Sequence, residues 1–133
     1  MRKKYVDVTA IGPGTPAGQF LRRFWQPVHL SRNLPTGRPV ALRVLGENFT
    51  LFRGASGTPY LVGPRCAHRG LALSTGRVEG ESIRCFYHGW CYAGSGQCID
   101  QPAEKQGFAE RIKIPSYPIR EYLGMIFAYF GDG

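Results

Sequence analysis

No stretch of this sequence approaches the roughly 20 consecutive apolar residues that a membrane-spanning helix needs, so we expect no membrane partner. Acidic residues are also scarce: 9 Asp and Glu stand against 17 Lys and Arg, which leaves a net charge of +8. The basic residues 2–4 are followed by Asp7 and a Gly-Pro-Gly turn instead of an apolar stretch, which is not the pattern of a secretory signal. These absences favour a cytoplasmic protein.

The excess of basic residues lacks the pattern of a nucleic-acid-binding protein. The basic side chains are scattered along the chain, and no DNA- or RNA-binding motif is present. We interpret most of them as solvated surface and expect no nucleic acid partner. A basic face would instead attract an acidic protein by electrostatic steering.

Histidine and cysteine are rare, with three and four residues, whereas glycine and proline number 18 and 10. Abundant Gly and Pro predict many turns and therefore many short strands. A hydrophobic content of 43% in 133 residues is sufficient for one globular domain with a modest core. The expected organisation is a single β-rich domain over residues 1–133.

Local patterns predict one short helix and a series of strands. Thr15-Pro16 is typical of an N-cap followed by the first helical residue, with the helix running toward Trp25. Hairpin turns are expected at residues 46–48 and 94–96. The predicted strands are 27–30, 40–45, 49–52, 59–62, 82–85, 89–92, 97–99, 116–120 and 125–130.

The rare cysteines and histidines form two boxes, Cys66-Ala67-His68 and Cys85-Phe86-Tyr87-His88, with 16 residues between them. In a [2Fe–2S] centre of the Rieske type, two histidines replace two cysteines on one iron, so each box can supply one thiolate and one imidazole. The ligands of the first box are closer in sequence than those of a usual structural zinc pair. A binuclear cluster removes this difficulty, because the two side chains of a box can bind different irons.

Gly70 and Gly89 follow the two histidines closely, where a loop around a cluster needs positive φ angles and a close approach of the backbone. A lone buried Cys or His is usually a core residue. The combined pattern favours the iron–sulfur site over zinc or the absence of a metal.

The segments Cys66 to Gly70 and Cys85 to Trp90 resemble the cluster-binding pair of Rieske non-haem iron oxygenases, the ring-hydroxylating enzymes. The rest of the chain is similar to the first part of the large subunit of phthalate 4,5-dioxygenase and its relatives. The segments that carry this similarity are 24–28, 45–48, 51–53, 76–79, 102–104 and 124–131. Because those subunits continue into a larger catalytic domain, the resemblance implies a truncated N-terminal domain.

The resemblance implies an all-β, Rieske-type iron–sulfur fold of several small antiparallel sheets. It also implies a cluster-binding subdomain of two loops, at about residues 63–102, inserted in the β base. The implied cofactor is a Rieske [2Fe–2S] cluster, with Cys66, His68, Cys85 and His88 as its ligands.

Several neighbours of the ligands are expected to touch the cluster or its ligands. Trp90 would cover the cluster, and Arg69 would pair with a carboxylate such as Glu79 or Glu81. Tyr92 could donate its hydroxyl group to a cysteine sulfur, as the corresponding Tyr does in some Rieske proteins, although packing in the core would also account for it.

The two remaining cysteines, Cys91 and Cys98, lie on either side of the predicted turn at 94–96. If they are directly opposed across the hairpin, a disulfide could form between them. A reducing cytoplasm argues against it, so free thiols are expected.

The chain has too few histidines for oxygen chemistry of its own. Ring hydroxylation in the resembling family takes place at a mononuclear iron held by two histidines and a carboxylate. Only His29 remains after the two boxes, so no such catalytic domain is expected in these residues.

The resemblance therefore implies one-electron transfer, as part of an oxidoreductase of the ring-hydroxylating dioxygenase or monooxygenase class. A reductase or ferredoxin would supply the electron, and a mononuclear-iron catalytic domain would accept it through His88. A trimer is expected only of a full-length protein. Reduction adds a negative charge, tempered by Arg65, Arg69 and Arg84. A stand-alone Rieske ferredoxin and a metal-stabilised binding module without redox activity remain the alternatives.

The boxes also predict a low reduction potential. Cytochrome bc-type Rieske proteins carry an extra cysteine in each box and a serine after the second His-Gly, where this chain has Leu71, Tyr87 and Trp90. Hydrogen bonds to cluster sulfurs stabilise the reduced state, so the loss of the serine lowers the potential. We expect voltammetry to give a value toward the low end of the roughly −150 to +300 mV Rieske range. A strongly positive potential would contradict this prediction.

Overall fold

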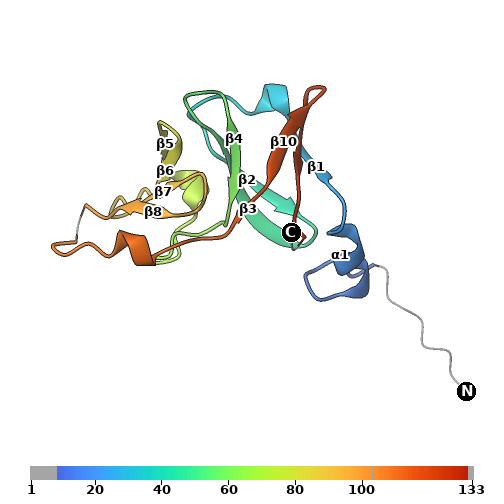
Figure 1. The fold of residues 1–133 in the computed structure, drawn as a ribbon, viewed down its shortest axis with the longest axis horizontal. Coiled ribbons are helices and arrows are strands. Elements are labelled where there is room, and N and C mark those ends of the chain that lie inside the picture. The colour runs from blue at the N-terminus through green and yellow to red at the C-terminus, as the bar shows by residue number, and fades with distance from the viewer. Residues whose placement is uncertain (1–8, 103, 132–133) are drawn as a thin grey trace, which may run out of the picture.

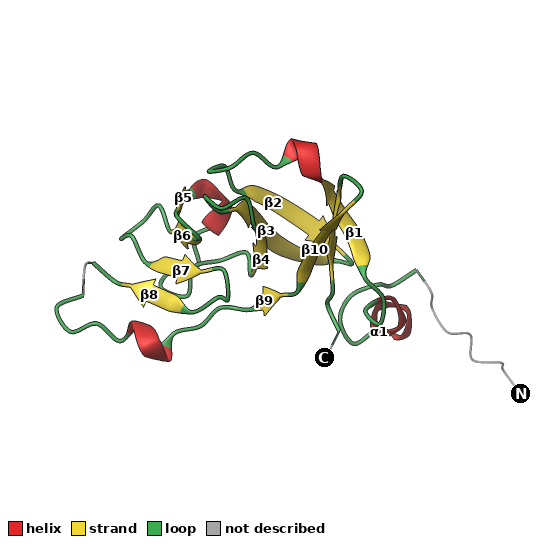
Figure 2. Cartoon of the chain, turned by 45° about the horizontal axis from the view of Figure 1, so that its top comes forward, coloured by secondary structure: helices red, strands yellow, loops and turns green. Residues whose placement is uncertain are grey.

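Three small antiparallel sheets form the framework of the computed structural model, which describes residues 9–102 and 104–131 (Figures 1 and 2). The first sheet holds, in order, β1 (Gln26–Leu30), β11 (Met125–Ala128) and β10 (Ile119–Tyr122). The second sheet holds β2 (Val40–Val44), β3 (Glu47–Arg53), β4 (Pro59–Val62) and β9 (Ser116–Tyr117). The third holds β5 (Arg77–Glu79), β6 (Ser82–Arg84), β7 (Cys91–Ala93) and β8 (Cys98–Asp100). The expected all-β class is confirmed.

The helical segments are short. They are α1 (Pro16–Leu21) and the three 3₁₀ turns η1 (Ser31–Asn33), η2 (Leu73–Thr75) and η3 (Ala109–Arg111). Within the described residues, no helix has the length and apolar character needed to cross a membrane.

The strands β3 and β4 are central, because side chains on both of their faces are buried. Successive side chains of a strand point to opposite faces. Leu51 and Leu61 therefore pack with Ile126 in one hydrophobic cluster, between the first and second sheets. Phe52 and Val62 face the other way and belong to a second cluster, shared with the third sheet. We call these the base cluster and the site cluster.

The third sheet is an excursion of the chain between β4 and β9. These two strands are neighbours, with Leu61 opposite Tyr117, so the chain leaves and returns at the same place. The Gly63 N–H donates a hydrogen bond of 2.8 Å to the Pro115 carbonyl and closes the neck of the excursion. Figure 1 shows the third sheet at one side of the molecule, away from β1 and α1. The expected subdomain of about residues 63–102 lies inside this excursion.

The expected turn at residues 46–48 is wrong in its bounds, which begin one residue and end two residues too late. The chain turns between β2 and β3 at Leu45 and Gly46, with φ angles of 50° and 78°, and Asn48 already lies in β3 opposite Arg43. Positive φ at both central residues is the mark of a type I′ turn, which usually contains Asn-Gly or Asp-Gly. Leucine is rare in this conformation, so the usual sequence signal is missing. The expected turn at 94–96 is confirmed.

The helix α1 begins as predicted, with the Thr15 hydroxyl accepting a hydrogen bond from the Gly18 N–H at 3.1 Å. It ends at Leu21 and does not continue toward Trp25. The Arg22 side chain turns inward and donates hydrogen bonds to the Gly18 carbonyl and to Glu47. Beyond it the chain continues only in tighter turns, because the N–H groups of Arg23 and Phe24 donate to carbonyls three residues earlier. The strand β5 was not predicted, because three residues are too few to show alternation.

An ion pair between Arg53 and Glu121 joins the first two sheets, with Nη2 of Arg53 2.8 Å from Oε2 of Glu121. The hydrogen bond from Arg53 holds the pKa of Glu121 below its ordinary value of 4.5. A lowered folded-state pKa stabilises the protein above the unfolded-state pKa, and this contribution disappears as the pH falls through the folded-state value. We expect Glu121→Gln to reduce the free energy of unfolding at pH 7 by about 0.5–1 kcal/mol.

Urea denaturation at a series of pH values measures this effect. The wild-type and Glu121→Gln curves should converge below pH 4.5, as Glu121 becomes protonated. The control is Glu110→Gln, which removes the same charge at an exposed position in η3. A difference between the wild type and Glu121→Gln that persists unchanged at low pH would contradict the prediction.

Candidate metal centre

Two loops of closely similar construction carry the predicted ligands. In each loop the backbone N–H of the cysteine donates to the carbonyl five residues later, from Cys66 to Leu71 at 2.9 Å and from Cys85 to Trp90 at 2.8 Å. The first loop follows β4, and the second joins β6 to β7. These hydrogen bonds fold each loop back on itself, so that the cysteine and histidine of one box face the same space.

Positive φ angles occur where the sequence predicts them. Gly70 and Gly89 both have φ angles of 73°, in the left-handed region that glycine adopts without strain. His88 also has a positive φ, of 65°. A residue with a Cβ atom pays about 1–2 kcal/mol for this conformation, so surrounding contacts must hold it there.

The two loops bring all four predicted ligands together. Cys66 and Cys85 are each only 3% exposed and belong to the site cluster. The rings of His68 and His88 have centroids 5.1 Å apart. Burial raises the pKa of the Cys85 thiol. The site thus has buried thiols on the inside, while His88 is exposed and His68 half-buried on the outside.

The donor set fits a binuclear cluster. Nδ1 of His68 is buried and has no hydrogen-bond partner, which is the state of a ring nitrogen available to a metal. Among the described residues, no three Cys, His, Asp or Glu side chains are arranged to hold one metal ion. A cluster with two protein ligands on each iron needs no such triad.

Tyr92 lies directly beneath the first loop and is fully buried. Its Oη atom is 3.2 Å from Sγ of Cys66 and accepts a hydrogen bond of 3.0 Å from the Ala67 N–H. Burial raises the pKa of Tyr92, so the phenol keeps its proton near neutral pH. This proton is therefore available for donation to the Cys66 sulfur.

Trp90 stacks on His68, with ring centroids 4.5 Å apart and planes inclined by 17°.

The predicted pairing of Arg69 with Glu79 or Glu81 is wrong. Arg69 is exposed, whereas Glu79 pairs with Arg84 and with a second arginine of the third sheet, and Glu81 accepts hydrogen bonds from Ser56 and Tyr60. Arg77 reaches Glu79 from two residues earlier on the same strand, β5, and Arg84 reaches it from the paired strand β6.

Two arginines beside the site were not recognised as contacts of the loops. Arg65 donates to the Gly70 carbonyl at 2.8 Å, and Arg84 donates to the Gly89 carbonyl at 2.6 Å. Each arginine immediately precedes the cysteine of its box, and this repeated Arg-Cys pair is the sequence signal that could have identified them.

Cys91 and Cys98 are free thiols, as expected. The register places Cys91 opposite Asp100 and Tyr92 opposite Cys98, with a bulge in between. Cys98 therefore shares the inner face of the sheet with Tyr92, whereas Cys91 lies on the outer face near Arg84. Because the two thiols lie on opposite faces of the sheet, they cannot form the cross-strand disulfide.

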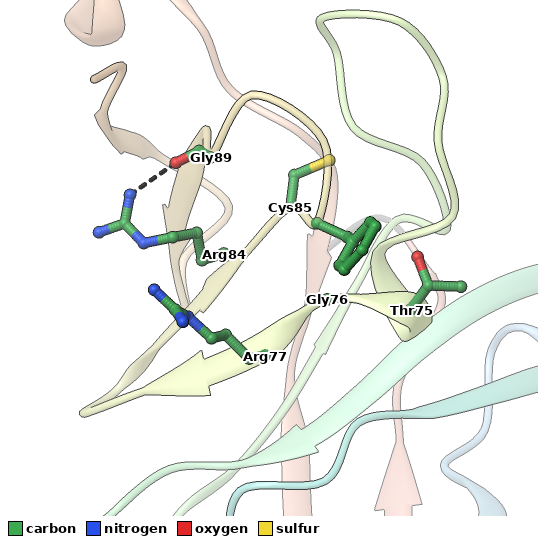
Figure 3. A pocket seen from close by; sticks show the side chains of 7 residues that line it. Thr75, Gly76, Arg77, Arg84, Cys85 and Gly89 are labelled. Atoms are coloured by element: carbon green, nitrogen blue, oxygen red, sulfur yellow. Dashed lines mark hydrogen bonds between the residues drawn. The ribbon is translucent and has the colours of Figure 1, made fainter. Parts of the chain in front are cut away.

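The second loop borders a hollow of about 360 Å³, shown in Figure 3. Its lining residues are Thr75, Gly76, Arg77, Arg84, Cys85, Phe86 and Gly89. Figure 3 shows the side chains of Arg84 and Cys85 pointing away from each other, with the Arg84 guanidinium directed at the Gly89 carbonyl.

Comparison with known proteins also indicates a [2Fe–2S] cluster site of the Rieske type. Residues 24–118 match the family model of the Rieske [2Fe–2S] domain. The chain is 48% identical over 127 residues to the alpha subunit of phenoxybenzoate dioxygenase from Ectopseudomonas oleovorans, a match covering 94% of this chain and 31% of that subunit. It is 35% identical to the oxygenase subunit of phthalate 4,5-dioxygenase from Pseudomonas putida, over 87% of this chain and 27% of that subunit.

A solved structure agrees with these sequence matches. The terminal oxygenase of carbazole 1,9a-dioxygenase from Novosphingobium sp. KA1 superposes with a TM-score of 0.74 and 34% identity, over 82% of this chain and 30% of that chain. The protein belongs to the Rieske [2Fe–2S] domain family, and its cofactor is the Rieske-type cluster that this family binds. It spans less than a third of the length of these relatives.

The hydroxyl group of Tyr92 provides a test of the site. We expect Tyr92→Phe to make the reduction potential more negative by roughly 40 mV, because loss of about 1 kcal/mol of hydrogen bonding to the reduced state corresponds to that shift in a one-electron couple. Voltammetry on the iron-loaded protein measures it. Tyr117→Phe is the control, since Tyr117 packs in the base cluster. Equal potentials for wild type and Tyr92→Phe would show that Tyr92 only fills space.

Proposed function

We propose that this chain is the electron-transfer domain of a ring-hydroxylating oxygenase. It would hold the [2Fe–2S] cluster through Cys66, His68, Cys85 and His88, receive one electron from a reductase or ferredoxin, and pass it to a mononuclear iron in a catalytic domain. The observation that carries the proposal is the grouping of these four side chains with buried thiols and an exposed imidazole, His88, at the surface. The relatives cited above are oxygenase subunits, which favours this function over a stand-alone ferredoxin.

When bound, the cluster supplies a one-electron redox couple. The two cysteines anchor it, and their burial keeps water from the sulfurs, because both thiols lie in the site cluster. Trp90 covers one face of the His68 ring, which leaves His88 as the more accessible imidazole. An exposed imidazole that is also a ligand offers a short path between cluster and partner, so we assign electron exchange to His88.

The charges around the site indicate where an acidic donor would bind. Arg84 is paired with Glu79 and Asp100, so its charge is largely compensated. Arg65, immediately before the first loop, and Arg69, within it, are exposed, and neither forms an ion pair with any described residue. We therefore expect donor binding on the side of the first loop, with an association rate that falls as ionic strength rises.

Iron and acid-labile sulfide analysis tests the proposal. The purified protein should contain about two of each per chain and should be reversibly reduced by dithionite. His68→Ala and His88→Ala should lose most of the iron. His29→Ala is the matched control, because His29 lies in β1 of the first sheet, far from the boxes, with its Nε2 3.2 Å from the Asn33 carbonyl. This variant should keep the full iron and sulfide content.

Other outcomes separate the alternatives. One zinc and no sulfide per chain would contradict the cluster assignment. A complete cluster that cannot be reversibly reduced would indicate a binding module without redox activity. The rate at which a reduced ferredoxin reduces the cluster is the test of the donor surface. If neither salt nor Arg69→Gln changes this rate, the assigned donor surface is contradicted.

A further inference from the structure

Arg84 occupies the end of β6, immediately before the second loop. Its Nε atom donates to Glu79 at 2.7 Å, and its Nη1 atom donates to the Gly89 carbonyl at 2.6 Å and to Asp100 at 2.9 Å. Only 21% of the side chain is exposed. An arginine guanidinium keeps its proton in proteins, so Arg84 offers charged donors to all three groups.

The register of the third sheet explains how these groups meet. Arg84 lies opposite Cys91, which in turn lies opposite Asp100, so these three residues share the outer face of the sheet. Glu79 reaches the same face from β5, diagonally across from Arg84. The two carboxylates thus approach the guanidinium from β5 and β8, the edge strands of the sheet, and fix it in place before the loop begins.

The second loop has an unusual backbone conformation next to the Gly89 carbonyl. His88 and Gly89 are consecutive residues with positive φ angles, of 65° and 73°. A residue with a Cβ atom stays in this conformation only where its surroundings enforce it. On the inner side of the loop Cys85 N–H holds the Trp90 carbonyl, and on the outer side Arg84 holds the Gly89 carbonyl.

The first loop shows the same contact in a weaker form. Arg65 bonds the Gly70 carbonyl, but it is exposed and forms no ion pair with any residue that the structure describes. His68 is not among the described residues with positive φ. The arginine anchored by two carboxylates therefore occurs on the loop whose histidine has the strained backbone.

We propose that Arg84, held by Glu79 and Asp100, is a positioning residue that fixes the backbone of His88 and Gly89 and so directs the His88 imidazole to its iron. This inference rests on the proposed function, since it takes His88 as a ligand. Arg84 acts through the loop backbone and does not touch the imidazole itself. Glu79 and Asp100 compensate the positive charge of Arg84. We therefore assign Arg84 to holding the loop and not to binding a partner protein.

The test compares Arg84→Gln with Arg77→Gln in the iron-loaded protein. Arg77 provides a matched control, because it also pairs with Glu79, at 3.0 Å, and is 74% exposed. Both variants remove one positive charge and the ion pair with Glu79, but only Arg84 also pairs with Asp100 and holds the loop carbonyl. The readouts are the electron paramagnetic resonance spectrum of the reduced cluster and the rate of iron loss to a chelator.

We expect Arg84→Gln to lose iron about tenfold faster or more and to show altered g values, as when a residue supporting a metal ligand is removed. Arg77→Gln should match the wild type in both measurements. Arg84→Lys should fall between them, because an ammonium group keeps the charge but lacks the planar, forked donors of a guanidinium. Arg65→Gln should have a smaller effect than Arg84→Gln.

Thermal unfolding curves distinguish positioning from a general loss of stability. If Arg84→Gln does not fold, Arg84→Lys carries the test: altered g values support the proposal, and unchanged g values together with wild-type iron retention overturn it. If Arg84→Gln folds and equals Arg77→Gln in both readouts, the proposal is also overturned. Absence of iron and sulfide from the wild type would instead overturn the proposed function.

Discussion

The burial of Cys66 and Cys85 in one hydrophobic cluster is the interaction on which the metal centre depends. That cluster includes Phe52 and Val62, which come from the central strands of the second sheet. The first loop follows β4 directly and the second lies more than 20 residues beyond the end of β4, yet both cysteines share a single packed environment with those strands.

The site has a clear direction from inside to outside. The thiols are enclosed, His68 lies under Trp90, and His88 is exposed. This arrangement suits the proposed electron transfer, because the thiols are enclosed while the His88 imidazole is accessible. Here the enclosed part is built from apolar side chains, and the accessible part is built from loop backbone held by arginines.

The positively charged side chains near the site have two different environments. Arg84 is compensated by two carboxylates and organises the second loop, whereas Arg65 and Arg69 are exposed beside the first. Net charge alone could not separate these roles, because a guanidinium bonded to the protein and one open to a partner count equally in a sequence. The pairing of strands β5 to β8 separates the two kinds of arginine, because it brings Glu79 and Asp100 to Arg84.

The sequence by itself determined the family, the cofactor, the β-rich class and the glycine positions, because ligand spacing and positive-φ glycines are local properties that chain order alone reveals. Strand pairing determined the rest. The register between β7 and β8 placed Cys91 and Cys98 on opposite faces, and the type I′ turn at Leu45 followed from pairing and not from a turn motif. The partners of Glu79, and the contact of Arg84 with Gly89, arise between strands or around a loop. Such contacts depend on register, and a shift of one residue would turn each side chain to the other face.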